Sequence, residues 1–271
     1  MTWTFYEWSW NHTSAHTTRY VAGGGWAASE AIDTGTTSAF SPAAALDTAG
    51  NAIVLWVQSS NSADTVFANR YVPGTGWGTA ANIDSAPRGY AQGPRVAFAS
   101  DGSAMAVWYN YSQRGINVNR YVTGKGWGTA ALLSETADSG YDEGVQFTFD
   151  QTGNAMAVWN RYGGGLFASR YDAAGNTWTT PATIEEGGAD YSEQPAFFAG
   201  GNALTVWGRY AGNSYNIWSS LFTSAAGWGT PVMVNTTPDN CSDPHMVIDK
   251  NGLATVVWIQ SNSLYAAKAS F

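Results

Sequence analysis

Short apolar runs recur along the chain at an interval of about fifty residues, and each run ends in tryptophan. The runs read AIVLW, AMAVW, ALTVW and ATVVW, and they end at Trp56, Trp108, Trp159, Trp207 and Trp258, with Trp8 at the matching place of a shorter first copy. A second series is spaced by 50 or 51 residues: Trp26, Trp77, Trp127, Trp178 and Trp228. Self-similarity at such a period is typical of repeat architectures. The sequence therefore predicts one unit copied along the whole chain.

Each copy divides into four segments of strand length. In the copy over residues 94–133 the segments are PRVAFAS, SAMAVW, INVNRY and the stretch around GWGTAALL. Segments rich in β-formers, bounded by Gly, Asn or Asp, predict antiparallel strands joined by tight turns. We name these strands a, b, c and d in chain order.

Strand b is apolar on both of its faces. Ala104, Ala106 and Trp108 point to one face, whereas Met105 and Val107 point to the other. Because a sheet with one solvated face would alternate apolar and polar residues, this pattern indicates sheets stacked face to face around an axis. The sequence therefore predicts an all-β fold, a β-propeller whose blades are four-stranded and about fifty residues long. A β-solenoid is the alternative.

The copies also predict the number of blades. Strands b, c and d come first, four complete sets follow, and strands a, b and c end the chain. We expect one propeller domain over residues 1–271 with six blades, of which the two terminal blades each lack one strand. A five-bladed ring that leaves residues 1–24 as an extra hairpin is the alternative. Unpaired strand edges in the incomplete blades predict self-association or strand addition from a partner.

The turn between strands c and d carries a family resemblance. The copies read VAGGGW, VPGTGW, VTGKGW, YDAAGNTW and TSAAGW. The fourth, residues 171–178, resembles the Asp-box turn of sialidase-like (BNR) propellers, roughly Ser-x-Asp-x-Gly-x-Thr-Trp, and lies between the strands where that family places it. The box is structural in that family, so the resemblance implies a propeller fold and no particular activity. The chain is also similar in architecture to propeller lectins of the tachylectin type, whose aromatic-rich blades offer sugar pockets.

Charge and composition exclude several classes of function. The net charge is -8, and nine arginines and three lysines form no stripe that could neutralise a row of phosphates, so we expect no nucleic acid. No stretch approaches the roughly 20 apolar residues of a membrane span, so we expect no membrane insertion. A single cysteine and three scattered histidines predict neither a metal site nor a cofactor. Few charges among many Gly, Ser, Thr, Asn and aromatic residues suit an extracellular or cell-surface protein.

Candidate ligand-binding residues lie in the d-to-a and b-to-c loops, which emerge on one face of a propeller. They are Tyr90, Gln92, Tyr111, Tyr141, Glu143, Arg161, Tyr162, Tyr191, Glu193, Arg209 and Tyr210. Flat rings can stack on a pyranose, and planar polar side chains can hydrogen-bond adjacent hydroxyls. The alternative for the tyrosines is packing of the loop against its blade. The alternative for Arg161 and Arg209 is an ion pair with a nearby Glu.

These features predict a non-catalytic, lectin-like or adhesion propeller that binds a glycan or glycoprotein. The Arg-Ile-Pro signature of sialidases has no match, and Glu143 with Glu193, together with Asp142, are the carboxylates that could serve hydrolysis. Equivalent positions in a repeat favour repeated binding subsites, whereas catalysis needs two carboxyl groups in different environments. We therefore expect no enzymatic activity and no catalytic residue. The alternatives are a structural or protein-interaction propeller, such as a subunit of a surface assembly, and, third, a glycoside hydrolase or sialidase-like enzyme.

Overall fold

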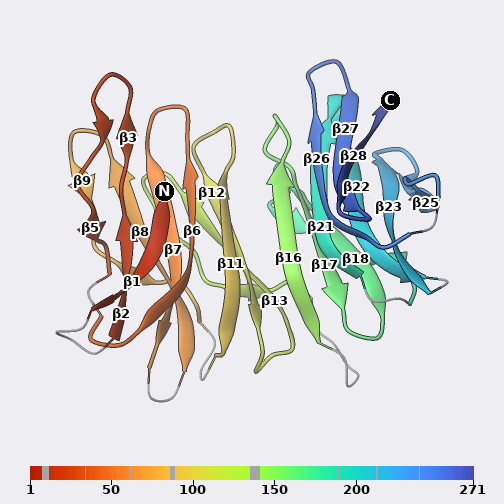
Figure 1. The fold of residues 1–271 in the computed structure, drawn as a ribbon. Coiled ribbons are helices and arrows are strands. Elements are labelled where there is room, and N and C mark those ends of the chain that lie inside the picture. The colour runs from red at the N-terminus through yellow and green to blue at the C-terminus, as the bar shows by residue number, and fades with distance from the viewer. Residues whose placement is uncertain are drawn as a thin grey trace. The chain divides into compact units, whose positions relative to one another are not determined.

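The computed structural model describes residues 1–7, 12–33, 35–60, 63–85, 89–134, 141–187, 190–211, 213–237 and 239–271, but not the side chains of residues 2–7 and 190–193. The chain divides into two compact units: unit 1 covers Met1–Glu135 and unit 2 covers Thr136–Phe271. Apart from a 3₁₀ turn at Ala199–Gly201, the regular elements in these ranges are strands, which confirms the all-β prediction (Figure 1). Within the described residues, no helix is long and apolar enough to cross a membrane.

Unit 1 contains four antiparallel sheets in its described residues, one of them a short two-stranded ladder. Sheet 1 contains β1 (Thr2–Glu7), β2 (His12–Thr17) and β5 (Glu30–Ala31), and the ladder pairs β3 (Tyr20–Val21) with β4 (Gly25–Trp26). Sheet 2 contains β6 (Ala39–Leu46), β7 (Ala52–Ser59), β8 (Asp64–Val72), β9 (Gly76–Trp77) and β10 (Ala81–Asn82). Sheet 3 contains β11 (Ala91–Phe98), β12 (Ala104–Asn110), β13 (Gly115–Val122), β14 (Gly126–Trp127) and β15 (Ala131–Leu132).

Unit 2 contains three antiparallel sheets in its described residues. Sheet 4 contains β16 (Asp142–Phe149), β17 (Ala155–Arg161), β18 (Gly165–Asp172), β19 (Thr177–Trp178) and β20 (Ala182–Glu185). Sheet 5 contains β21 (Asp190–Phe198), β22 (Asn202–Ala211), β23 (Ser214–Thr223), β24 (Gly227–Trp228) and β25 (Val232–Met233). Sheet 6 contains β26 (Cys241–Ile248), β27 (Leu253–Gln260) and β28 (Ser263–Ser270).

The predicted strand d is present in sheets 2 to 5, but it is made of two short segments. In sheet 2, Tyr71 faces Trp77 and Ala68 faces Ala81, so two residues of β8 lie opposite three residues of the outer strand. The same shift recurs in sheets 3, 4 and 5. One extra residue in a strand is a β-bulge, and it interrupts the ladder locally. Among the described residues, sheet 1 has no strand in the place of strand a and sheet 6 none in the place of strand d.

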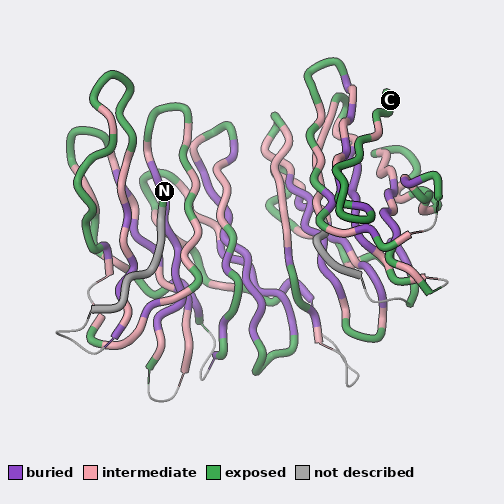
Figure 2. The backbone as a smooth tube through the Cα atoms, in the orientation of Figure 1, coloured by how far each residue is buried: buried purple, intermediate pink, exposed green. Residues whose placement is uncertain are grey.

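The sheets of each unit pack face to face. In unit 1, β11 packs against β6 and β7, and β6 packs against β1 and β2. In unit 2, β21 packs against β16 and β17, and β26 packs against β21, β22 and β23. Strand b is accordingly buried on both faces in sheets 2 to 5 (Figure 2), and Trp56, Trp108, Trp159 and Trp207 are fully buried. Stacked four-stranded blades confirm the β-propeller fold, while the number of blades stays a prediction.

A second bulge lies in strand a, opposite each tryptophan of strand b. In sheet 3 the register shifts between Gln92 and Arg95, across from Trp108, and Gly93 there has a φ of 54°. The same shift occurs in β6, β16, β21 and β26. A bulge bends its strand and increases the local twist. It separates the first two residues of strand a from the part of the strand that packs in the core.

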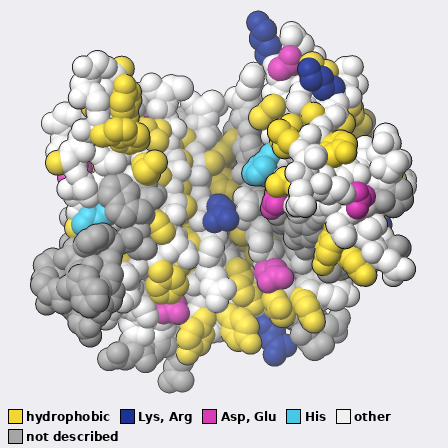
Figure 3. All heavy atoms as spheres, in the orientation of Figure 1, with side chains coloured by type: hydrophobic (Ala, Val, Ile, Leu, Met, Phe, Trp, Pro, Cys, Tyr) yellow, Lys and Arg dark blue, Asp and Glu magenta, His cyan; other side chains and the backbone are white. Residues whose placement is uncertain are grey.

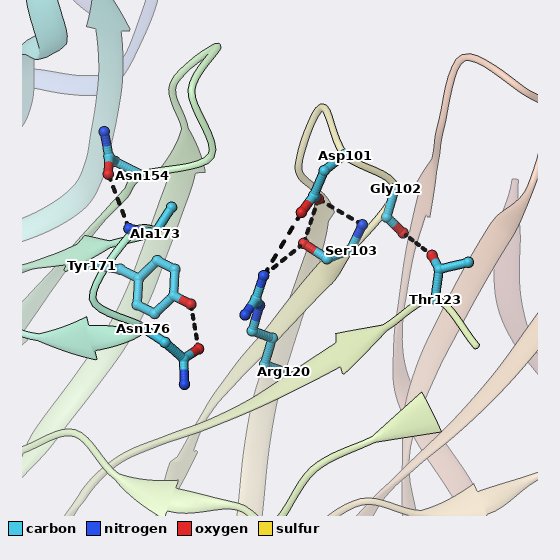
Figure 4. A network of polar contacts seen from close by, with 9 residues as sticks. All are labelled: Asp101, Gly102, Ser103, Arg120, Thr123, Asn154, Tyr171, Ala173 and Asn176. Atoms are coloured by element: carbon cyan, nitrogen blue, oxygen red, sulfur yellow. Dashed lines mark hydrogen bonds and ion pairs between the residues drawn. The ribbon is translucent and has the colours of Figure 1, made fainter. Parts of the chain in front are cut away.

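We call the end of a sheet that carries the a-to-b and c-to-d turns its turn end. In sheet 3, Asp101 accepts hydrogen bonds from the Ser103 amide at 2.8 Å and the Ser103 hydroxyl at 2.6 Å, and forms an ion pair with Arg120 at 3.8 Å (Figure 4). The hydrogen bond from Ser103 is the main reason why the pKa of Asp101 lies below its ordinary value. In the next turn, Thr123 donates to the Gly102 carbonyl at 3.0 Å. These contacts fix the turns of one sheet to each other.

The turn that resembles an Asp-box makes contacts of the same structural kind. The Gly175 amide donates to Asp172 at 2.7 Å, and the Tyr171 hydroxyl donates to Asn176 at 2.6 Å. The Ala173 amide donates to Asn154 in the neighbouring a-to-b turn at 3.0 Å (Figure 4). Asn176 has a φ of 51°, a conformation that asparagine tolerates better than most residues. The Asp172 carboxylate is therefore used within its own turn.

Candidate active site

The opposite end of each sheet, which carries the d-to-a and b-to-c connections, is here called its loop end. At this end the first residue of strand a faces the last residue of strand b. In three sheets a small residue faces an amide side chain, as in the pairs Ala39 with Gln58, Ala91 with Asn110, and Cys241 with Gln260. In sheets 4 and 5 an aspartate faces an arginine, as in the pairs Asp142 with Arg161 and Asp190 with Arg209. At this position of the repeat, two neighbouring sheets thus have charged residues where the other three have neutral ones.

Asp142 and Arg161 form a bidentate ion pair. Arg161 Nε donates to Asp142 Oδ1 at 2.7 Å, and Arg161 Nη2 donates to Asp142 Oδ2 at 3.1 Å. The Asp142 side chain is fully buried, and the guanidinium lies 4.1 Å from the centre of the Phe167 ring. Bidentate pairing fixes both planar groups. Arg161 is therefore held by a carboxylate on one side and an aromatic face on another.

Glu185 ends strand β20 of sheet 4 and contacts sheet 5. Its Oε2 accepts a hydrogen bond from Trp207 Nε1 at 3.1 Å, and its Oε1 forms an ion pair with Arg209. The Glu185 side chain is only 5% exposed. Burial raises its pKa, and the Arg209 charge and the two hydrogen bonds oppose that shift without cancelling it. Glu185 is therefore a carboxyl group that retains its proton to a higher pH than an exposed glutamate.

Gly165 allows the Glu185 backbone to approach strand c. A Cβ atom at Gly165 would lie 2.1 Å from the Glu185 carbonyl oxygen. The Gly165 φ is 96°, a region that side chains disfavour. Gly115 has the same role in sheet 3, where a Cβ atom would lie 2.0 Å from the Ser134 carbonyl oxygen. The end of strand d is thus placed by a glycine at the start of strand c.

Tyrosine pairs surround this end of the sheets. In sheet 4 the Tyr162 amide donates to the Tyr141 carbonyl at 2.9 Å, and the two rings stack with centroids 5.1 Å apart and planes 5° apart. Tyr162 is 63% exposed, so one face of this stack is open to solvent. In sheet 5, Tyr210 and Tyr215 lie 4.9 Å apart, and both are exposed. An exposed tyrosine pair offers a flat apolar surface with hydroxyl groups at its edge.

The structure brings some of the predicted site residues together. Tyr141, Arg161 and Tyr162 share the loop end of sheet 4 with Glu143, which is exposed and follows the buried Asp142. Arg209 and Tyr210 lie at the same end of sheet 5. Tyr191 and Glu193 begin β21, but their side chains lie outside the described residues.

The remaining predicted residues lie in unit 1, at the loop end of sheet 3. The Tyr111 amide donates to the Tyr90 carbonyl at 3.0 Å, and both tyrosines and Gln92 are exposed. This is the same loop-to-loop contact that joins Tyr141 and Tyr162 in sheet 4. Within the part of the chain that the structure describes, no group of three or more His, Cys, Asp or Glu side chains is placed to hold a metal ion.

Glu185 is not among the site residues predicted from the sequence, although the repeat contains a signal for it. The matching positions at the end of strand d are Asp33, Asp84, Ser134 and Asn235. This position of the repeat thus carries a carboxyl group in three copies and a neutral side chain in two. Glu185 differs from the other copies through its contacts with Trp207 and Arg209. These two residues belong to the next sheet and come close to Glu185 only in the folded protein.

The comparisons with known proteins give a fold and no family. No protein family matches the chain, and no curated protein sequence matches it. Among solved structures, an ulvan lyase from a polysaccharide lyase family is similar with a TM-score of 0.64 and 9% identity, over 96% of this chain and 75% of that one. An α-L-arabinanase from Penicillium chrysogenum, complexed with arabinobiose, is similar with a TM-score of 0.56 and 11% identity, over 83% of this chain and 76% of that one. A Dyadobacter fermentans protein of unknown function is similar with a TM-score of 0.54 and 13% identity, over 81% of this chain and 74% of that one.

These findings correct two expectations from the sequence. A non-catalytic, lectin-like or adhesion protein without enzymatic activity is wrong, because enzymes that act on polysaccharides stand among the structures with this fold. The physical error lay in treating the copies as equivalent. The aspartate–arginine positions occur in two sheets only, and burial separates Glu185 from the exposed Glu143. The Asp-box resemblance is supported for the propeller fold, while no Asp-box family matches.

Proposed function

We propose that the protein is a glycan-cleaving enzyme with its catalytic centre at the loop ends of sheets 4 and 5. The observation that carries the proposal is the environment of Glu185, a carboxyl group that is nearly buried beside Trp207 and Arg209 and has a raised pKa. Cleavage of a glycosidic bond needs a carboxylic acid that protonates the leaving oxygen, and burial is how such an acid keeps its proton. The names of the structures that share this fold support the same class of substrate.

In this proposal the second carboxylate is Glu143. It is the second residue of strand a in the sheet whose strand d ends at Glu185, and it is exposed whereas Glu185 is buried. Two carboxyl groups in different environments can take the separate roles of acid and of base or nucleophile. Asp142 fixes the Arg161 side chain at the loop end of the same sheet. The stacked pair of Tyr141 and Tyr162 serves as a platform for a sugar ring next to the cleaved bond.

Activity on polysaccharides tests the proposal directly. Purified protein is incubated with arabinan, xylan, mannan and uronate-containing polymers, and new reducing ends and oligosaccharide products are measured. We expect Glu185→Gln to lower kcat by about 10²-fold or more, as loss of a general acid does. Glutamine keeps an oxygen for Trp207, as Gln58 does for Trp56 at 2.9 Å, so the melting temperature should change little. Asp84→Asn, at the matching position of sheet 2, is the control and should keep full activity.

Two outcomes would overturn this assignment. If the wild-type protein releases no product from any of these polymers, the protein is not a glycan-cleaving enzyme of this kind. If it releases product and Glu185→Gln is as active as wild type, the catalytic centre lies elsewhere.

The tyrosine platform has its own test. Tyr162→Ala should raise KM by about tenfold, equivalent to about 1.4 kcal/mol of binding, with a smaller change in kcat. Tyr111→Ala, at the matching position of sheet 3, is the control.

We also propose that the protein acts outside the cell or on its surface, because polymeric glycans occur there. Detection of the native protein in the culture medium or on the cell surface would test this location.

A further inference from the structure

We propose that the glycan cleaved at this site carries no carboxylate or sulfate groups and that the reaction is hydrolysis. This inference rests on the proposed function and names its substrate class. Polysaccharides are cleaved in two chemically distinct ways, by hydrolysis or by β-elimination next to a uronate. The two routes are favoured by different charges in the site, and the charges at the loop ends of sheets 4 and 5 favour hydrolysis.

β-Elimination needs a free positive group or an equivalent donor. A base removes the proton on the carbon next to the uronate carboxylate, the electron pair forms a carbon–carbon double bond, and the glycosidic oxygen leaves with a proton. Negative charge accumulates on the carboxylate during this step, so it must be met by a cation or by strong hydrogen-bond donors. Binding any uronate or sulfate needs the same groups.

Unit 2 offers no free cation at this end. Its lysines and arginines are Arg161, Arg170, Arg209, Lys250 and Lys268. Arg170 faces Met156 and Lys268 faces Thr255, both near the start of strand b, and Lys250 follows Ile248 in an a-to-b turn, so these three belong to the turn ends. The loop ends are left with Arg161 and Arg209.

Both of these arginines are already paired. Arg161 is bound in bidentate fashion by Asp142, and Arg209 is paired with Glu185. Each guanidinium also lies over an aromatic ring, Phe167 at 4.1 Å and Trp218 at 5.1 Å. The remaining basic group, His245, lies opposite Val257 in sheet 6 and hydrogen-bonds to Gln194 at 2.8 Å. On the face shown in Figure 3, the Lys and Arg side chains are few and form no continuous patch.

Carboxylates outnumber these cations at the same ends of the sheets. They flank the starts of β16 and β26 and the end of β20: Asp142, Glu143, Glu185, Glu186, Asp239 and Asp243. Two of them, Asp142 and Glu185, contact the two arginines. Even with Glu185 protonated, the remaining carboxylates leave an excess of negative charge. Such a surface repels an anionic polymer and slows its association, whereas it leaves a neutral one unaffected.

Hydrolysis is compatible with the excess of carboxylates at these loop ends. The glycosidic carbon–oxygen bond breaks, the leaving oxygen takes a proton from Glu185, and the oxygen of a water molecule adds to the anomeric carbon while a carboxylate accepts its proton. No cation is required, because the charge that develops on the sugar ring is positive and carboxylates stabilise it. The excess of carboxylates that opposes a uronate therefore favours this route.

Matched polymers test the inference. A uronate polymer and the same polymer after chemical reduction of its carboxyl groups differ in charge alone, and neutral arabinan and xylan extend the comparison. We expect kcat/KM at least about tenfold higher on the reduced polymer than on the native one. In water labelled with heavy oxygen, the new reducing end should carry the label. Unsaturated products, detected by their ultraviolet absorbance, or a preference for the native uronate polymer would overturn the inference.

A binding experiment distinguishes a failure of this inference from a failure of the proposed function. Glu185→Gln is run through native gels that contain either polymer, at low and at moderate salt. Retardation by the neutral polymer supports the inference even if the wild-type protein cleaves nothing, in which case the proposed function alone fails. Retardation by the uronate polymer, or by neither polymer, overturns the inference.

A charge variant provides an internal control. Asp142→Asn removes a negative charge and releases the Arg161 guanidinium, so retardation by the uronate polymer should increase. Asp84→Asn removes the same charge from unit 1 and should leave the retardation unchanged. Equal behaviour of the two variants would contradict the role given to the Asp142–Arg161 pair.

Discussion

Units 1 and 2 are built alike and charged differently. Each contains three stacked sheets, the same pair of bulges, and strand-b tryptophans that are buried in the core. In the sequence, unit 1 has seven Lys and Arg against eight Asp and Glu, whereas unit 2 has five against twelve. Their net charges are therefore -1 and -7. A nearly constant scaffold thus supports two very different electrostatic surfaces.

The difference is concentrated at the loop ends. The turn ends of both units use aspartate side chains to fix tight turns, as Asp101 does in unit 1 and Asp150 in unit 2. At the loop ends, unit 1 pairs alanine with an amide, and sheets 4 and 5 of unit 2 pair aspartate with arginine. The turn ends of the sheets therefore keep the contacts that maintain the fold, whereas the residue types at the loop ends differ between the units.

The largest expected effect is a loss of stability when the close approach of strands c and d, which both units share, is disturbed. Gly115→Ala in unit 1 and Gly165→Ala in unit 2 would each drive a Cβ atom to about 2 Å from a backbone oxygen. Backbone atoms cannot rotate away, so we expect each change to cost about 4 kcal/mol or more, and Gly165→Ala more because its φ is positive. Chemical denaturation measures the loss. Gly128→Ala, whose nearest atom would lie at 3.5 Å, is the control, and an unchanged Gly115→Ala would contradict the close approach of strands c and d.

The next effect concerns the charged position. Arg161→Met leaves the fully buried Asp142 without its partner, and we expect a loss of about 3–5 kcal/mol. The double variant Asp142→Ala, Arg161→Gln copies the Ala39 and Gln58 pair of unit 1 and should recover most of that loss. Denaturation of the single and double variants forms a mutant cycle. A double variant as unstable as Arg161→Met would show that the two loop ends are not interchangeable.

A smaller effect separates two fully buried tryptophans whose ring nitrogens differ in their hydrogen bonding. Trp207 Nε1 donates to Glu185, whereas Trp108 Nε1 has no hydrogen-bond partner among the described residues. Replacement by phenylalanine removes similar volume at both sites, so the difference between them reports the hydrogen bond. We expect Trp207→Phe to cost about 1–2 kcal/mol more than Trp108→Phe. Equal losses in thermal or chemical unfolding would refute the contact.

The smallest effect is a pH dependence that both units share. Asp33 and Glu185 occupy matching positions at the end of strand d, and burial raises the pKa of each above its ordinary value of 3.8 or 4.5. Each group therefore adds stability below its unfolded pKa, and this contribution is lost as pH rises through the folded pKa. Glu185→Gln and Asp33→Asn should each flatten that decline. Free energies of unfolding measured from below pH 3.8 upward would show it, and an unchanged profile would contradict the burial of these carboxyls.

The sequence predicts the scaffold because the scaffold is periodic. The spacing of Trp56, Trp108 and Trp159 reports one packing environment repeated in space, and the apolar faces of strand b report burial on both sides. The bulge in strand d was not foreseen, although Gly78, Gly128 and Gly229 mark its position in three copies. A local signal of this kind is recognised only when the register of the partner strand is known.

The candidate site is harder to predict because it is an exception to the period. Arg161 and Arg209 were identified because they break the pattern of their copies. Glu185 was not, since its partners Trp207 and Arg209 belong to the following sheet and only the packing of two sheets brings them together. Reasoning from equivalence of the copies then led to a binding protein. Periodicity describes the shared environment well and hides the positions where one copy differs.

The broken outer strand has a consequence for solubility. In sheets 2 to 5 the outer strand consists of segments of two to four residues that are out of line with each other, and these offer little template for pairing with another molecule. Sheet 6 presents instead the unbroken eight-residue β28, with Leu264 77% exposed. Aggregation of this protein, when concentrated or heated, should therefore start at β28, and a lysine in place of Leu264 is the change best suited to suppress it.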